Sequence, residues 1–494
     1  MPEGVPVEGL LSSILFDENT DKKILRISDD TFSDVMLDKI ITDKKNLTYL
    51  SCYCTYNDIK FRHEIFDELL NGSLYDSFKT LDNMLSALYQ SYDAFELAKY
   101  RYERILCAYN VCEQYCNVYN YIINISSDSF FIARLKDCLE CMHEDVRRVE
   151  NSLEECREIC KRTKQFKLYI SDVWCNAYSF CEDELSCRRG KFTECSKSLG
   201  WGDTELYHKI FAVSAEIASC INSLYENELR QMEIFCDKFV KLLNKNIINC
   251  RFEIRFYLAI CNIVRTLQKR GIPFCLPSIN NSKRFVVRDA YDIMLTYLKD
   301  IKAVPNDVEF SRNNGLFFLT GANGGGKTTY LCTACINLIF GIAGCPVFGT
   351  FAEIYPFNRV YTHFPKTERT DTGRYMEEIE RVDKIIANLT SDDFIFFNET
   401  FSGTNMQKGT EMALNVAQKI KEKNAYMLFV THFHGVANSD FPLLTTEDCE
   451  NNNAAQRTYK IVRSKTVKSS YAHDILKKYG LSREALEERF GDIF

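Results

Sequence analysis

One stretch of the chain combines residue types and spacing that suit phosphate binding. Residues 321–328 read Gly-Ala-Asn-Gly-Gly-Gly-Lys-Thr, which is the pattern G-x-x-x-x-G-K-T. Its glycines let the backbone bend so that N–H groups converge on phosphate oxygens. We expect Lys327 to reach the outer phosphates of a nucleotide and the Thr328 hydroxyl to bind Mg²⁺. The predicted nucleotide-binding residues here are Gly321, Ala322, Asn323, Gly324, Gly325, Gly326, Lys327, Thr328 and Thr329.

A second pair of residues suits the hydrolysis of ATP. Asn398 and Glu399 directly follow the apolar run 394–397, which is typical of a buried strand. In phosphate-loop ATPases the first polar residue at such a strand end steadies Mg²⁺, and the second, a glutamate, orients the attacking water. We therefore predict Glu399 as a catalytic residue, and Asn398 with Thr328 as the metal site. The alternative is a core strand with polar ends.

A histidine follows the next apolar run. Residues 425–430 precede Thr431 and His432. Ligands bind at the carboxyl edge of open α/β sheets, so a histidine at this strand end can reach a γ-phosphate. We predict His432 as a second catalytic residue and regard His434 as a weaker candidate, because a lone histidine is more often structural.

The segments around these residues indicate an α/β fold. The run 315–320 reads as a strand and residues 330–336 as a helix, which is the context that the glycine-rich motif requires. Beyond Gly271, short apolar runs alternate with helical segments, and Arg284–Arg288 is an early strand. Such alternation predicts a largely parallel sheet.

The N-terminal half has the texture of long helices. No proline occurs between Pro6 and Pro273, and glycines are rare in this stretch. Two sets of apolar residues mark helical faces: Leu81, Met84, Leu85, Leu88 and Tyr92, then Ile210, Val213, Ile217, Ile221 and Leu224. We divide the chain into a mostly α-helical region, 1–275, and an α/β region, 276–494.

Composition narrows the class of protein. The chain has 494 residues, 26% of them charged, and a net charge of -7, so no global basic field indicates nucleic-acid binding. The 22 cysteines often recur at helical spacing, which favours reduced core thiols in a cytoplasmic protein. Zinc at Cys138-x-x-Cys141 is the alternative. No signal peptide is expected at the N-terminus, and residues 331–348 read as a buried helix rather than a membrane span.

In their order and spacing these motifs resemble the MutS family of DNA mismatch-repair ATPases, of the ABC-type class. The resemblance is carried by Val304-Pro305-Asn306-Asp307, LTGANGGGKTT, Arg359–Phe364, FNETFSGTNMQKG and FVTHFHG, and by Ser469–Ala472 leading into Tyr479-Gly480-Leu481. It covers roughly residues 280 to 485. More weakly, Phe61–Phe66 resembles the start of the family's helical core.

The resemblance implies more of the site and the assembly. It places the family's signature at residues 372–378, so that Thr372, Gly373 and Arg374 would contact ATP held by the other subunit of a homodimer. His432 matches the family's switch histidine. The implied fold is an α/β P-loop (ABC-type) ATPase domain with a C-terminal helical dimerisation region, preceded by a mostly α-helical core and lever domain.

The chain departs from the family pattern at several positions. Gly373-Arg374 replaces the signature's Ser-Thr, Asn398 replaces an aspartate, and Ala303 stands where an adenine-stacking aromatic often precedes Val-Pro-Asn-Asp. Phe16-Asp17-Glu18 has the letters of the mismatch wedge, but no domain of suitable size precedes the helical core. We expect a short, divergent relative that does not recognise mismatches.

The sequence thus predicts a cytoplasmic, homodimeric MutS-like ATPase that hydrolyses ATP slowly with Mg²⁺. We expect it to act as a clamp on DNA in repair or recombination, and we expect no membrane partner. Basic clusters at 147–148, 161–167 and 188–191 favour DNA contact. The alternative is a nucleotide-switched scaffold with little hydrolysis and no DNA binding, which Asn398 and the negative net charge favour.

Overall fold

The computed structural model describes most of the chain and divides it into two compact units. The described residues are 25–72, 74–98, 101–125, scattered positions from 132 to 139, 143–164, 166–170, 175–179, 226–240, 245–365, 373–447 and 457–464. One unit comprises residues 1–12 and 73–254, and the other 13–72 and 255–494. A single cut near residue 275 does not reproduce these units, because residues 13–72 and 255–275 group with the α/β part.

The first unit is mainly helical. Its helices are α4 (Leu74–Leu97), α5 (Arg101–Asn124), α7 (His143–Lys164) and α11 (Glu226–Val240), and β1 (Phe166–Ile170) pairs antiparallel with β2 (Cys175–Ser179). Helix α12 (Lys245–Lys269) begins in this unit and ends in the other. Leu81, Leu85 and Leu88 are buried on α4, whereas Met84 and Tyr92 are half-buried, so the first predicted stripe is confirmed in part. The second stripe, 210–224, lies outside the described residues.

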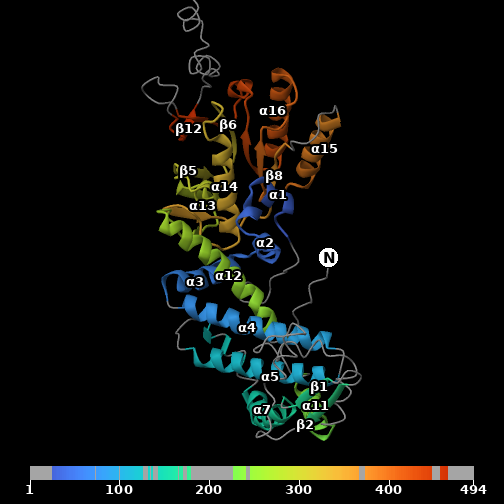
Figure 1. The fold of residues 1–494 in the computed structure, drawn as a ribbon. Coiled ribbons are helices and arrows are strands. Elements are labelled where there is room, and N and C mark those ends of the chain that lie inside the picture. The colour runs from blue at the N-terminus through green and yellow to red at the C-terminus, as the bar shows by residue number, and fades with distance from the viewer. Residues whose placement is uncertain are drawn as a thin grey trace, which may run out of the picture. The chain divides into compact units, whose positions relative to one another are not determined.

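The second unit is built on a six-stranded sheet in the order β12-β11-β6-β10-β9-β8. Figure 1 labels β12, β6 and β8 of this sheet. The strands β11, β6, β10, β9 and β8 run parallel, and β12 is antiparallel to β11. Their bounds are β6 (Leu316–Thr320), β8 (Val360–His363), β9 (Phe394–Asn398), β10 (Tyr426–Val430), β11 (Leu443–Thr446) and β12 (Ile461–Ser464). The predicted strands before Gly321, Glu399 and Thr431 are thereby confirmed.

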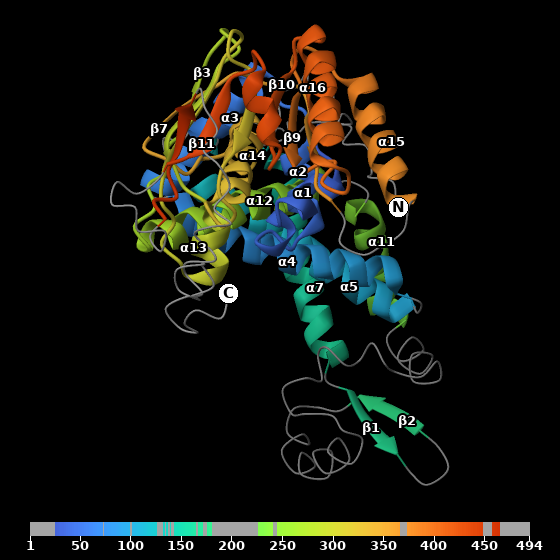
Figure 2. The same ribbon diagram turned by 90° about the horizontal axis from the view of Figure 1, so that it is seen from above.

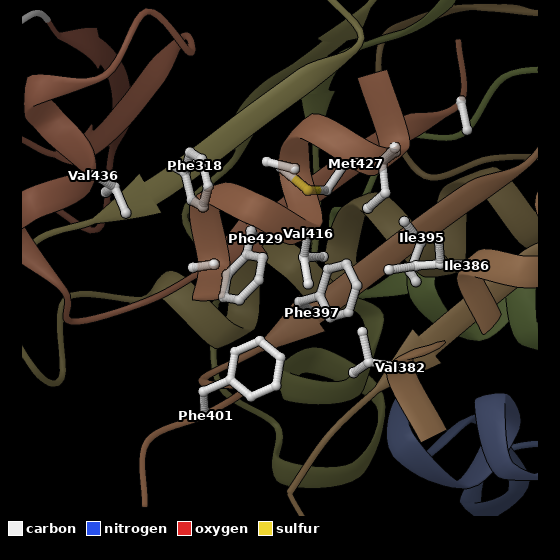
Figure 3. Packing of buried hydrophobic residues seen from close by; sticks show 14 of the residues in the cluster. Phe318, Val382, Ile386, Ile395, Phe397, Phe401, Val416, Met427, Phe429 and Val436 are labelled. Atoms are coloured by element: carbon white, nitrogen blue, oxygen red, sulfur yellow. The ribbon is translucent and has the colours of Figure 1, made fainter. Parts of the chain in front are cut away.

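The central strands are apolar on both sides because both faces of the sheet are covered. On one face, Ile395, Phe397 and Phe429 join a buried cluster with residues of α15 (Gly373–Asn388) and α16 (Met406–Glu422) (Figure 3). On the other face, Phe394 packs edge-on against Phe310, at 4.9 Å between ring centroids. The alternation of side chains along β9 thus divides the strand between two cores.

The expected early strand at 284–288 exists as β4 (Phe285–Ala290), but in a second sheet of order β3-β7-β4-β5. Its neighbours β5 (Asn306–Phe310) and β7 (Phe351–Ile354) are antiparallel to it, and β3 (Ser278–Ile279) is parallel to β7. The expectation of a parallel sheet therefore holds only for the first sheet. Parallel neighbours need a long crossover connection, whereas antiparallel neighbours do not. The connection from β4 to β5 contains only the short helix α13 (Ile293–Lys299), which suits antiparallel pairing.

Helix α14 (Lys327–Ile342) contacts both sheets, on the side of the six-stranded sheet opposite α15 and α16 (Figure 2). Its residues from Tyr330 to Ile342 are all buried, which confirms the predicted buried helix. Within the described ranges, no helix is both long and apolar enough to cross a membrane.

The N-terminal segment of this unit borders β8. Ile27 forms a parallel bridge with Val360. The remaining helices are α1 (Asp29–Asp34), η1 (Leu37–Lys39), α2 (Lys44–Ser51), α3 (Tyr56–Asn71) and η3 (His434–Asn438). Across the described part of the chain the cysteines are free thiols and mostly buried, whereas Cys138 and Cys141 lie outside it.

Candidate nucleotide site

The glycine-rich loop leaves β6 and turns sharply into α14. Gly321 has φ 126° and Gly324 has φ 72°, in the left-handed region that favours glycine. A Cβ at Gly321 would lie 2.4 Å from Oγ1 of Thr446 on β11, whereas a Cβ at Gly324 would meet nothing within 4 Å. The loop therefore packs tightly on β11 at its start and is open at Gly324.

The Lys327 side chain lies within the loop that precedes it. Its Nζ donates hydrogen bonds to the carbonyl oxygens of Gly321 (2.9 Å) and Ala322 (3.0 Å) and to Oδ1 of Asn323 (3.3 Å). Burial lowers the pKa of the Lys327 ammonium, and the nearby Glu399 carboxylate opposes that shift. The cation is held in place by neutral acceptors, for which phosphate oxygens would be stronger substitutes.

Thr328 and Asn398 meet across the carboxyl edge of the sheet. The Thr328 hydroxyl donates to Oδ1 of Asn398 at 3.0 Å. Thr328 lies at the start of α14, which follows β6, and Asn398 ends β9. β10 lies between β6 and β9, since each of them pairs with β10. The contact brings together a hydroxyl and an amide oxygen, which are ligand types that Mg²⁺ accepts.

Glu399 adopts a left-handed backbone conformation directly after β9. Its φ is 50°, and its N–H donates to the carbonyl oxygen of Val430 at 2.8 Å. The next residue, Thr400, is fully buried, and its hydroxyl lies 2.9 Å from Nδ1 of His363 at the end of β8. Burial and the nearby Arg381 lower the pKa of His363 to about 4. A neutral histidine therefore supports the backbone next to Glu399.

A cavity of about 620 Å³ opens beside these residues. Its lining includes Lys327, Thr328 and Glu399 together with apolar residues that precede β5. The lining residues are Leu295, Ile301, Lys302, Ala303, Val304, Asn306, Asn323, Gly324, Gly326, Lys327, Thr328, Thr329, Tyr330, Thr333, Glu399 and Tyr459. The structure thus brings the loop and Glu399 to one cavity, and Asn398 touches it through Thr328.

The two histidines after β10 do not line this cavity. His432 is half-buried, and its ring packs on Phe433 at 4.6 Å between centroids. His434 begins η3, and its buried Nδ1 has no hydrogen-bond partner among the described residues. The role predicted for His432 remains a prediction.

The signature segment is described only in part. Thr372 lies outside the described residues, and Gly373 and Arg374 form the start of α15. The expected contact of these three residues with a nucleotide on a second subunit remains a prediction.

Three residues around the site were not predicted. Tyr459 lines the cavity, although it lies far along the chain from the glycine-rich loop. His363 and Thr400 form the buried contact behind Glu399. His363 lies within the segment 359–364 that carries the resemblance, so its position was a usable signal, whereas nothing near Tyr459 marked it.

The segment that contains this site matches a known family model. The family model described as MutS domain V matches residues 317–488, which include the loop, Asn398, Glu399 and His432. The DNA mismatch repair protein MutS of Caldanaerobacter subterraneus subsp. tengcongensis is 27% identical over 161 residues, which cover 32% of this chain and 18% of the relative.

Two further relatives agree. The DNA mismatch repair protein MutS of Syntrophobacter fumaroxidans is 30% identical over 168 residues, covering 33% of this chain and 19% of the relative. That of Oceanobacillus iheyensis is 23% identical over 233 residues, covering 45% of this chain and 26% of the relative. The matches thus span about a quarter or less of the relatives' own length. Over residues 317–488, the chain thus matches domain V of the MutS family and resembles these DNA mismatch repair proteins.

Proposed function

We propose that this chain is an ATPase with an ABC-type P-loop site, which binds ATP and hydrolyses it slowly with Mg²⁺. The observation that carries the proposal is the convergence of Lys327, Thr328 and Glu399 on one cavity at the carboxyl edge of parallel strands. A buried cation, loop N–H groups and a carboxylate are the groups that a triphosphate and its attacking water need.

Each residue has a defined proposed role. Lys327 exchanges its loop carbonyl partners for the outer phosphate oxygens, and Glu399 orients the attacking water. Thr328 and the carbonyl oxygen of Asn398 would hold Mg²⁺, which when bound neutralises phosphate charge. His432 senses the γ-phosphate after a rearrangement of its loop. Since Thr328 and Asn398 are neutral, Glu399 is the only acidic residue among those that line the described cavity.

The relatives suggest where this ATPase acts. They are named as DNA mismatch repair proteins, so we propose that the chain works on DNA as an ATP-driven dimeric clamp in the cytoplasm. Thr372, Gly373 and Arg374 of one subunit would complete the ATP site of the other. We further propose that the clamp does not prefer mismatched over perfect duplex.

Steady-state phosphate release from purified protein tests the ATPase proposal. We expect Mg²⁺-dependent turnover by the wild type, none by Lys327→Ala, and unchanged turnover by Lys384→Ala, which removes an exposed lysine of α15. Turnover that survives Lys327→Ala would contradict the proposed site.

A second candidate function is a nucleotide-switched scaffold that hydrolyses little and binds no DNA. The amide of Asn398 in place of a carboxylate is the observation that favours it. Duplex binding measured across a salt series separates the two functions, because a clamp that neutralises phosphates weakens steeply as salt rises. Binding that is absent at low salt, with and without ATP, would favour the scaffold.

Subunit complementation tests the shared site. Lys327→Ala and Gly373→Asp proteins are each expected to be inactive, whereas their mixed dimer keeps one site with both halves intact. Partial return of phosphate release on mixing is expected. A mixture as inactive as its components would contradict composite sites.

A further inference from the structure

Phe433 follows His432 and packs against its ring. The two ring centroids are 4.6 Å apart, with 50° between the ring planes. Phe433 is fully buried, in the cluster that also contains Phe401 and Phe429 (Figure 3). Its amide N–H donates to Oγ1 of Thr431 at 3.1 Å, which fixes the backbone at the same point. The half-buried ring of His432 therefore rests on a ring that the core holds in place.

Gly409 of α16 lies against the far end of the Phe433 ring. A Cβ built on Gly409 would be 2.3 Å from Cζ of Phe433 and 2.6 Å from its Cε1, so the ring occupies the space that a side chain at position 409 would need. The backbone does not itself require glycine here, because Gly409 lies within a helix and its φ is not positive. In a helix, alanine is favoured over glycine by about 1 kcal/mol. The contact with Phe433 is what requires glycine at this position.

A second close contact joins the same two elements. A Cβ on Gly435 of η3 would lie 2.8 Å from Cγ2 of Thr410 on α16. Each element thus offers a glycine to a side chain of the other, Gly409 to Phe433 and Gly435 to Thr410. Close-packed interiors have low compressibility and transmit strain. We therefore expect α16 and the segment 433–438 to move as one body.

Helix α16 begins shortly after Glu399. Between them, the N–H of Thr404 donates to the carbonyl oxygen of Phe401 at 3.2 Å, directly before the residue that caps the helix. Phe401 is buried in the same cluster as Phe433. The start of α16 is therefore linked to Glu399 along the chain and to His432 through Phe433.

We propose that Phe433 is a positioning residue for His432, and that its contact with Gly409 makes the position of the His432 ring depend on α16. This inference rests on the proposed ATP site and deepens it. The His432 ring does not line the cavity in this structure, so it must move to reach a γ-phosphate. With Phe433 seated on Gly409, a shift of the start of α16 carries the ring with it, and the loop after β10 does not rearrange alone.

Combined substitutions in the full-length protein test this coupling through steady-state phosphate release with Mg²⁺. Gly409→Ala displaces the Phe433 ring and should lower kcat by about 10²-fold, as a misplacement of about 1 Å far from the chemistry can. KM for ATP should stay unchanged, because Lys327 and its loop are untouched. The same substitution should have no further effect in Phe433→Leu, where Cζ, Cε1 and Cε2 are absent. It should also have none in His432→Gln, where the group through which it acts is gone.

A second readout follows His432 directly and does not depend on activity. Isotope labelling of histidine alone gives NMR signals from the seven histidines, and the His432 signal is the one that His432→Gln removes. Because His432 packs on an aromatic ring, its chemical shift should change in Phe433→Leu and in Gly409→Ala. The matched control is Phe441→Leu, which removes a half-buried ring packed on the same cluster. It should change neither the His432 signal nor kcat.

The double variant Gly409→Ala/Phe433→Leu keeps the test decisive if Gly409→Ala alone does not fold. Leucine lacks the ring atoms that the new Cβ would meet, so the double variant should fold and should match Phe433→Leu in kcat. A kcat well below that of Phe433→Leu would show that Gly409 acts through some other contact, and would overturn the inference.

The outcomes separate this inference from the function on which it rests. A wild-type kcat in Gly409→Ala, an equal loss from Gly409→Ala in the His432→Gln background, or an unchanged His432 signal would overturn the positioning role alone. Full turnover by His432→Gln would remove the proposed role of His432, and no turnover by the wild type would remove the ATPase; either result takes this inference with it. A loss in Gly409→Ala that disappears in both backgrounds, with a shifted His432 signal, would support it.

Discussion

Two turns at the carboxyl edge of the six-stranded sheet both contain left-handed backbone conformations, but they use different residue types to reach them. The turn after β6 reaches left-handed conformations with glycine, at Gly321, Gly324 and Gly326. The turn after β9 reaches them with large residues, since Glu399 has φ 50° and Phe401 has φ 67°. Non-glycine residues in this region cost about 1–3 kcal/mol each and persist only where the surroundings enforce them.

The difference follows from which atoms each turn must present. In the proposed site the first turn offers backbone N–H groups to phosphate, so its left-handed positions carry no side chain. The second must carry the carboxylate of Glu399, which glycine cannot supply. Phe401 is 1% exposed in the cluster with Phe397 and Phe429, and its burial stabilises the strained turn (Figure 3). Glycine suffices where the backbone takes part in the chemistry. Where a side chain takes part, packing in the core must stabilise the strained backbone.

The comparison predicts its largest effect at Glu399. In Glu399→Gln the shape and the backbone are kept but the negative charge is lost, so the attacking water is no longer activated. We expect phosphate release to fall by about 10²- to 10⁴-fold, the usual range for a group that moves a proton, while ATP still binds. Single-turnover phosphate release together with ATP calorimetry would check this. Wild-type turnover no higher than that of Glu399→Gln would remove the ATPase assignment.

Replacing glycines of the first turn should destabilise the protein, and by different amounts at Gly321 and Gly324. Gly321→Ala adds a Cβ that clashes with Thr446 at an unfavourable φ, whereas Gly324→Ala meets only the cost of its φ. We expect destabilisation of about 2–4 kcal/mol for the first and about 1 kcal/mol for the second. The thermal unfolding midpoint of the α/β unit is the measurement. Equal effects would show that packing on β11 is not what requires glycine.

The stability of the fold should depend on pH through His363, which contacts the second turn at Thr400. The pKa of this histidine is about 4 in the folded protein, against about 6.5 when unfolded, because of burial and Arg381. Below pH 6.5 the unfolded chain takes up a proton that the folded protein does not, so stability present above pH 6.5 is lost as the pH falls towards 4.

His363→Asn should flatten this dependence by an amount on the order of 1–3 kcal/mol. Asn can still contact the Thr400 hydroxyl but does not titrate. Arg381 on α15 is the charged group that contributes to the shift, and Asp34 on α1 binds the neighbouring Thr362 at 2.7 Å. Unfolding in guanidinium at pH 7.5 and pH 5, compared between wild type and variant, gives the difference. An identical pH dependence in both proteins would remove His363 as its source.

The smallest effect is expected at Asn398, whose carbonyl already accepts from Thr328 at 3.0 Å. Asn398→Asp keeps an acceptor oxygen and adds charge, so we expect turnover to change by less than about tenfold, since charge assistance of one hydrogen bond is worth roughly 1 kcal/mol. Mg²⁺ titration of phosphate release measures it. A change as large as that of Glu399→Gln would mean that Asn398 is not a weak replacement for aspartate.

The sequence by itself determined the parts of the site that are local along the chain. The spacing of Gly321, Lys327 and Thr328 defines a strand, a turn and the start of a helix, and β6 and α14 have those positions. An apolar run that ends in Asn398 and Glu399 likewise predicts a strand end. Such patterns need only neighbours within a few residues, and short-range periodicity records them well.

Tertiary structure decided what depends on contacts between distant segments. Thr446 closes on Gly321, Tyr459 lines the cavity beside Gly326, and His363 supports Thr400 across two strands. It also moved the strand 285–290 into a second sheet and left His432 outside the cavity lining. Which strands become neighbours, and in what register, is fixed by packing of the whole core, and no local spacing in the sequence records it.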